Sequence, residues 1–229
     1  MEQLQKRVVM YEWKDIVKRG LWGLSILFIS ITYPLLNQYR GDTNSVFTFV
    51  DKLIPFNKYF ILPYVSWYIF MAVFFTILCI VDKDRYLKLL ITLNIGMITC
   101  YLIYYFYPTY VPRPMITETD FLSGMVLNLY AADNPYNCFP SIHVLNSVLV
   151  ALYTYESDKV NKSVKAICVI VSSSIILSTM FIKQHYFADV AAGIIFAFIL
   201  YFSFKNVKFK FNDISKGKSP NSIGECNML

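Results

Sequence analysis

Long apolar blocks separated by short charged linkers run along this 229-residue chain. The blocks are roughly 20 residues long, which is the length that an α-helix needs to cross a hydrocarbon layer about 30 Å thick. The composition agrees, with 56% hydrophobic and 17% aromatic residues, because a soluble domain of this size needs less apolar sequence. The pattern predicts an all-α polytopic membrane protein with six transmembrane helices. They are expected at about residues 21–36, 59–81, 86–107, 139–155, 164–182 and 187–204.

Lysine and arginine residues are concentrated on alternate linkers. Most of the 21 lie in residues 1–20, 82–88 and 156–165 and in the tail after residue 204. Basic segments that flank transmembrane helices stay in the cytoplasm, so both termini are predicted to be cytoplasmic and the other loops to face outward. The chain is therefore divided into a basic N-terminal segment, a six-helix domain and a basic tail. Their expected bounds are residues 1–20, 21–204 and 205–229.

The net charge of +6 does not indicate a nucleic-acid partner, because the basic residues flank apolar blocks instead of forming one patch. The bilayer is the partner that they indicate, and we expect a bacterial cell membrane. The five cysteines include no Cys-x-x-Cys pair, so neither a disulfide framework nor a zinc cluster is predicted. No small-residue cleavage site follows the first apolar block, so no cleaved signal peptide is expected.

The chain has two histidines, and both lie at the outward ends of apolar blocks. Titratable side chains in such places are costly to bury and are usually functional. His185 and Asp189 are four residues apart, so on a helix they share one face and the carboxylate can hold the imidazole. A histidine held by a carboxylate is a poised nucleophile or general base. Lys183 supplies a positive charge to the same segment.

Two further segments on the outward side have residues suited to an anion. Ser141 follows Pro140 where the fourth apolar block begins, and free backbone N–H groups in the first turn of a helix attract anions. His143 lies within the next turn and can give a proton to a leaving group. Arg113 lies between two prolines that limit where its guanidinium points, and arginine grips phosphate with two N–H groups.

Each segment has a plainer interpretation when it is taken alone. Arg113 can be an interfacial residue that reaches lipid headgroups. Ser141 and His143 can be a helix cap and a packing residue, and a neutral His185 can simply be satisfied by Asp189. The three segments are far apart in sequence, yet all are predicted on one side of the membrane, as a single site requires. The whole set therefore favours a site.

In their order and spacing, the three segments resemble the type 2 phosphatidic acid phosphatase superfamily of integral membrane enzymes. The family pattern is Lys-x6-Arg-Pro, then Pro-Ser-Gly-His, then Ser-Arg-x5-His-x3-Asp. The matching positions are Arg113-Pro114, Pro140-Ser141 with His143, Ser178, and His185 with Asp189. The resemblance covers roughly residues 59–204.

The resemblance implies a lipid-phosphate phosphatase that needs neither a metal nor a cofactor and takes its lipid phosphate at the outer face. His185 would attack phosphorus and form a phosphohistidine, and Asp189 would orient it. His143 would protonate the leaving alkoxide and then activate the attacking water. Arg113 and Ser141 would hold the phosphate oxygens.

The chain departs from the family pattern at three positions. The family lysine falls at Phe106, the glycine at Ile142 and the arginine at Thr179. Lys183, four residues after Thr179, is our candidate for the missing positive charge and hence for a third phosphate ligand. The family's phosphate site would then hold two cations where the usual pattern has three.

Four alternatives remain open at this point. The Tyr-x-Pro-Arg-Pro and Lys-x-His-Tyr-x2-Asp segments are also similar to inositol phosphorylceramide synthases, which transfer a headgroup to a lipid alcohol instead of water. An ion-coupled transporter would use buried charges, but it predicts them at mid-span on several helices. A serine protease would need Ser141 in a Gly-x-Ser-x-Gly setting, which is missing. Two histidines and a carboxylate can also hold iron or zinc, and a chelator would test that.

Overall fold

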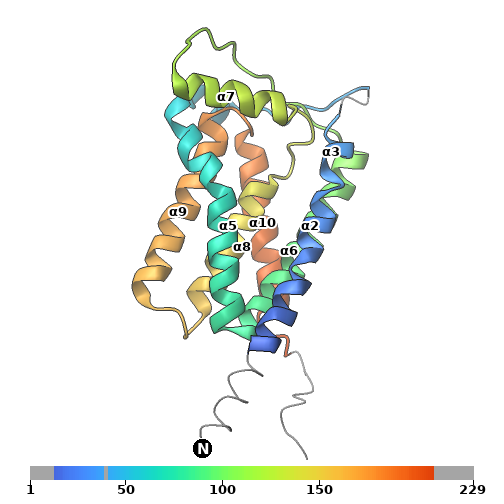
Figure 1. Cartoon of the computed structure of the whole chain (residues 1–229). Coiled ribbons are helices and arrows are strands. Elements are labelled where there is room, and N and C mark those ends of the chain that lie inside the picture. Colours follow the sequence, from blue (N-terminus) through green and yellow to red (C-terminus); the bar gives the residue numbers. More distant parts are fainter. Residues whose placement is uncertain (1–12, 39–40, 209–229) are drawn as a thin grey trace, which may run out of the picture.

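The computed structural model describes residues 13–38 and 41–208, and within these ranges the chain forms helices and no strand. The long helices run side by side in a bundle (Figure 1). The labelled helices are α2 (Leu24–Ser30), α3 (Tyr33–Leu36), α4 (Phe49–Leu53), α5 (Ile61–Val81), α6 (Lys83–Phe106), α7 (Phe121–Ala132), α8 (Ile142–Glu156), α9 (Lys162–Phe181) and α10 (Phe187–Phe204), with a 3-10 turn η1 (Lys58–Phe60) before α5. Predictions for residues 1–12 and 209–229 lie outside the described residues.

Five helical segments in the described ranges are long and apolar enough to cross a membrane. They are Trp13–Leu36, Lys58–Val81, Lys83–Phe106, Lys162–Phe181 and Phe187–Phe204. Each overlaps one of the expected apolar blocks, and α10 begins and ends where the sixth block was placed. The chain is therefore an all-α membrane protein.

The fourth expected span is a shorter helix at the centre of the bundle. α8 has 15 residues, fewer than the roughly 20 that cross a bilayer alone. It packs against α5, α6, α9 and α10. Its side chains Val144, Leu145, Leu149 and Val150 are fully buried. Because α8 has four other helices around it, most of its surface contacts protein and not lipid.

The first helix begins earlier than expected. Residues 13–22 are already helical and lead through a turn into α2, whereas the sequence analysis began this span at residue 21. Charged residues in this segment suggested a polar flank, but Arg19 pairs with Asp15 one turn away, with 3.4 Å between Nε and Oδ2. Such i,i+4 pairs support a helix, so the helix includes the charged segment.

The loop 108–138 was predicted to lie outside the membrane, and the sequence analysis assigned no helix to it. Its helix α7 lies across the end of the bundle opposite to the ends of the described chain, residues 13 and 208 (Figure 1). Asp120 starts α7, because its Oδ1 accepts hydrogen bonds from the N–H groups of Leu122 and Ser123 at 3.1 and 3.3 Å. With 12 residues α7 is too short to span a membrane. It covers the end of the bundle where both histidines lie.

Candidate active site

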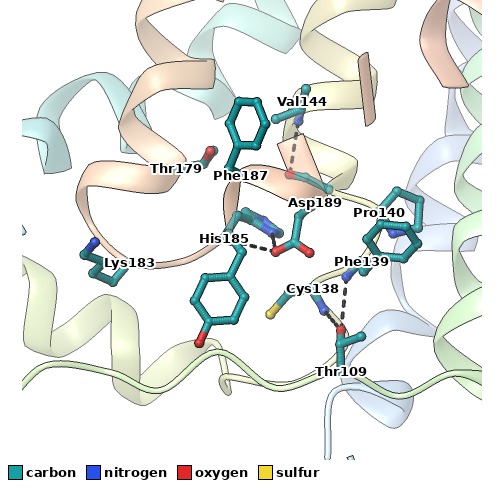
Figure 2. A network of polar contacts seen from close by, with 12 residues as sticks. Thr109, Cys138, Phe139, Pro140, Val144, Thr179, Lys183, His185, Phe187 and Asp189 are labelled. Atoms are coloured by element: carbon teal, nitrogen blue, oxygen red, sulfur yellow. Dashed lines mark hydrogen bonds and ion pairs between the residues drawn. The ribbon is translucent and has the colours of Figure 1, made fainter. Parts of the chain in front are cut away.

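His185 lies in the turn between α9 and α10, and Asp189 lies in the first turn of α10 (Figure 2). Nδ1 of His185 is 3.4 Å from Oδ2 of Asp189, and the same oxygen accepts a hydrogen bond from the Tyr186 N–H at 2.8 Å. Asp189 is fully buried and His185 is 8% exposed. Because Nδ1 faces the carboxylate, Nε2 is the nitrogen left for chemistry.

The chain around His185 is held by backbone bonds from α9. The Thr179 carbonyl accepts hydrogen bonds from the N–H groups of Gln184 and His185, at 3.0 and 3.1 Å. Lys183 has a φ of 54°, a left-handed conformation that is uncommon for a residue with a side chain. The position where the family pattern has an arginine, Thr179, thus shapes the histidine turn through its backbone.

Asp51 in α4 is a residue that the sequence analysis missed. Its Oδ1 accepts the N–H of Phe187 at 2.7 Å, at the start of α10. Its Oδ2 accepts the N–H and the hydroxyl of Thr48, both at 2.7 Å. The Thr-x-x-Asp pattern signals a capped helix start, but it does not indicate a contact with α10. Asp51 therefore links the segment before α5 to the turn that carries His185.

Ser141 brings the start of α8 against the first turn of α10. Its N–H donates to the Asp189 carbonyl at 3.1 Å, and its hydroxyl accepts the Val144 N–H at 3.4 Å as the N-cap of α8. Gly193 permits this approach, because a Cβ at that position would lie 2.9 Å from the Ser141 carbonyl oxygen. Any larger residue at 193 would push the two helix starts apart.

His143 faces His185 from the first turn of α8. The ring centroids of the two histidines are 6.0 Å apart. The other sides of the His143 ring contact Tyr64 and Trp67 of α5, at centroid distances of 4.9 and 4.6 Å. These aromatic neighbours fix the ring beside the catalytic candidate, which is the arrangement that proton transfer in one site requires.

Arg113 reaches the histidine turn from the loop before α7. Its Nη1 donates to the Lys183 carbonyl at 3.3 Å and its Nη2 to the Asp133 carbonyl at 3.4 Å. The guanidinium lies 4.5 Å from the ring centroid of Tyr130 in α7, close enough for a cation–π contact. Its Nε is buried and has no hydrogen-bond partner among the described residues. In the part of the chain that the structure describes, the guanidinium is therefore held by backbone carbonyls and an aromatic ring and not by an ion pair with a carboxylate.

The ammonium of Lys183 does not point toward the two histidines. Nζ donates to the carbonyl of Ile54 at the end of α4, and Figure 2 shows it pointing away from His185. Burial lowers the pKa of Lys183, and the charge of Asp51 opposes that shift. The structure thus brings together His185, Asp189, His143 and Ser141, with Arg113 beside them, and leaves the Lys183 ammonium at the end of α4.

Asp133, just after α7, is a second residue that the sequence analysis missed. Its Oδ1 accepts hydrogen bonds from the Tyr33 hydroxyl at 3.0 Å and from Nδ2 of Asn37 at 2.6 Å. Burial raises the pKa of Asp133, while the charge of Arg113 and the hydrogen bond from Tyr33 oppose the rise. The carboxyl therefore lies within electrostatic range of Arg113. No spacing rule marks it, because its partners lie about 100 residues away in the chain.

These features define a class of protein: a helical membrane protein with a buried His–Asp pair, a second histidine and an arginine at one end of its bundle. Among the described residues, no group of three or more histidine, cysteine, aspartate or glutamate side chains is placed to hold a metal ion. Two histidines with an arginine can bind a phosphate and transfer it.

A family model described as the PAP2 superfamily matches residues 42–203, well over half of the chain. The chain belongs to the PAP2 superfamily, and the resemblance noted from the sequence is confirmed. Membership supports an activity of the phosphatase or phosphotransferase type. No curated protein and no solved structure matches the chain significantly. The match begins after the first helix, so Trp13–Leu36 lies outside the matched residues.

Proposed function

We propose that the protein is a lipid-phosphate phosphatase that works through a phosphohistidine on His185. The observation that carries the proposal is the setting of the His185 ring. Its Nδ1 faces the Asp189 carboxylate, and the ring centroid of His143 lies 6.0 Å from its own. Nε2 attacks phosphorus, and the bond from phosphorus to the lipid oxygen breaks. Asp189 stabilises the imidazole as it becomes positively charged.

The remaining residues stabilise the transferring group and move the proton. Arg113 and the N-terminal turn of α8 at Ser141 are placed to stabilise the phosphate oxygens. His143 gives a proton to the departing lipid oxygen. In the second step it takes a proton from water, whose oxygen bonds to phosphorus as the bond to His185 breaks. Free phosphate leaves and both histidines return to their starting states, and we propose that no metal takes part.

We further propose six transmembrane helices, cytoplasmic termini and an outward-facing site in a bacterial cell membrane. α8 counts as the sixth helix because helices on all sides complete its path through the bilayer. Lys83, Arg85 and Lys88 lie in the first two turns of α6, and Lys205 caps the end of α10. These helix ends lie toward the bundle end opposite to α7 (Figure 1). That distribution supports a cytoplasmic position for their end and an outward position for the site.

The proposed function is tested with purified protein in detergent and a panel of lipid phosphates, in the presence of EDTA. We expect release of free phosphate from at least one phosphomonoester or diphosphate lipid, and no loss on adding EDTA. Activity that EDTA removes and a divalent metal restores would contradict the metal-free mechanism. A water-soluble short-chain substrate added to intact cells should also be hydrolysed, because the site is proposed to face outward.

Lys183 is proposed to supply part of the positive charge that the family pattern places at Thr179. Lys183→Ala is expected to lower kcat/KM by up to roughly tenfold. A direct charge-assisted contact would contribute about 1.5–3 kcal/mol, but the ammonium bonds the Ile54 carbonyl and would act on the phosphate from a distance. The matched variant Lys183→Gly suits the positive φ and removes the same charge, so both variants should lose activity alike. Full affinity and turnover in Lys183→Ala would show that the ammonium has no role in catalysis and only donates a hydrogen bond to the Ile54 carbonyl.

A phosphohistidine can also be resolved by an alcohol, so a headgroup or phosphoryl transferase is the second candidate. The observation that favours it is the polar contact of Asp133 with Tyr33 and Asn37 beside Arg113. The Asp133 carboxylate can accept a hydrogen bond from the hydroxyl of an alcohol, with which water would compete.

A further inference from the structure

The loop that carries Arg113 and the loop that leads into α8 are joined by backbone hydrogen bonds. The Val111 N–H donates to the Pro135 carbonyl at 3.0 Å, and the Asn137 N–H donates to the Thr109 carbonyl at 2.8 Å. Val111 and Thr109 are each 1% exposed. The two loops therefore form one buried unit at the end of the bundle where the histidines lie.

The hydroxyl of Thr109 adds a side-chain contact between these loops. Its Oγ1 accepts hydrogen bonds from the N–H groups of Cys138 and Phe139, at 2.9 and 3.1 Å (Figure 2). Asn137 has a φ of 58°, a left-handed conformation of the kind in which consecutive N–H groups converge on one acceptor. With the bond from Asn137 to its carbonyl, Thr109 accepts hydrogen bonds from three successive N–H groups.

The bonded N–H groups directly precede the start of α8. Phe139 is followed by Pro140 and Ser141, and His143 lies in the first turn of the helix. The Tyr104 hydroxyl donates to the Pro140 carbonyl at 2.7 Å, so α6 holds this short segment at a second point. A shift of Phe139 would be passed on to His143, because the residues between them have little freedom: one is proline and the others start a helix.

The same segment also contacts the turn that carries His185. The Cys138 side chain belongs to a buried apolar cluster with Val111 and Tyr186, and Tyr186 follows His185 in the chain. The guanidinium of Arg113 is held separately, by two backbone carbonyls. Loss of the hydroxyl at position 109 should therefore release the start of α8 and leave the guanidinium in place.

We propose that Thr109 is a positioning residue for the phosphate transfer, because its hydroxyl fixes the place of His143 beside His185. This rests on the proposed phosphohistidine mechanism. The two imidazole centroids are 6.0 Å apart, and proton transfer by His143 requires a fixed place beside the reacting oxygen. Thr109 acts through the backbone of residues 138–140 and takes no part in the bond changes. A misplacement of about 1 Å at a reacting group can lower a rate about 10²-fold.

The test compares Thr109→Val with Thr109→Ser in purified protein, on a lipid phosphate that wild type hydrolyses. Valine has the size of threonine but accepts no hydrogen bond, so the N–H groups of Cys138 and Phe139 lose their partner. We expect kcat to fall about 10–100-fold and KM to change less than about threefold, because Arg113 keeps its position. Serine keeps the acceptor, so Thr109→Ser should stay within about threefold of wild type in kcat.

A matched control and two further measurements separate positioning from a general loss of structure. Thr99→Val makes the same exchange in α6, where the hydroxyl donates to the Ile95 carbonyl of its own helix at 2.8 Å, and it should leave kcat unchanged. Hydrogen–deuterium exchange of a peptide covering residues 135–141 should be faster in Thr109→Val than in wild type and Thr109→Ser. An activated aryl phosphate should still give a burst of phenol in Thr109→Val, since its departure needs no proton from His143.

The outcomes separate this proposal from the proposed function. Wild-type kcat in Thr109→Val, an equal loss in Thr109→Ser, or unchanged exchange of residues 135–141 would overturn the role of the hydroxyl and leave the phosphatase intact. A burst that falls in proportion to lipid turnover would also overturn it, because partial unfolding lowers both alike. Neither phosphate release nor a phosphohistidine in wild type would overturn the proposed function, and the positioning role with it.

Discussion

Replacing His185 by alanine is expected to lower kcat/KM for lipid phosphate by at least about 10⁴-fold, because the proposed nucleophile is then missing. Asp189 and the Tyr186 N–H remain bonded to each other without the ring, so the turn should keep its shape. Free phosphate is measured for wild type and variant at equal protein concentrations, with size-exclusion profiles to show that the variant is folded.

A covalent intermediate gives this prediction a direct readout. Wild type quenched in alkali during turnover should carry phosphate on one histidine, and peptide mass spectrometry should place it on His185. His185→Ala should carry none. Phosphate found on His143, or more than about a tenth of wild-type turnover in His185→Ala, would show that the roles of the two histidines are assigned wrongly.

Replacing His143 by glutamine is expected to lower turnover of a lipid phosphate by about 10²–10⁴-fold, the usual contribution of a general acid or base. Glutamine keeps a polar side chain between Tyr64 and Trp67, which enclose the ring. The loss has two parts, because His143 is proposed to protonate the leaving oxygen and later to activate water. The nature of the leaving group separates these parts.

An activated aryl phosphate needs no proton on its leaving oxygen, so phosphorylation of His185 should survive in His143→Gln. Attack by water still lacks its base. The variant should therefore release one equivalent of phenol in a burst, accumulate phosphohistidine and then turn over slowly. Equal losses on the lipid and the activated ester, with no burst, would mean that His143 acts only as a packing residue between the two aromatic rings.

The positions of the membrane helices followed from local pattern. Apolar blocks flanked by charge marked α5, α6, α9 and α10, because a helix in lipid must be apolar over its whole length. The same rule failed at the first helix, where the Asp15–Arg19 pair lets a charged segment stay helical. It also missed α7, which follows the cap at Asp120 and owes its place to packing on the end of the bundle.

The sequence by itself determined the chemistry that is local in the chain. The i,i+4 spacing of His185 and Asp189 and the cap at Ser141 depend on a few bonds between near neighbours, so their residue types suffice to predict them. Only the tertiary structure decided that His143 meets His185, that Lys183 turns to Ile54, and that distant loops supply further carboxylates. Asp51 caps α10 from 136 residues away, and Tyr33 reaches Asp133 across 100. Such contacts depend on how whole helices and loops pack, and residue spacing along the chain does not constrain that packing.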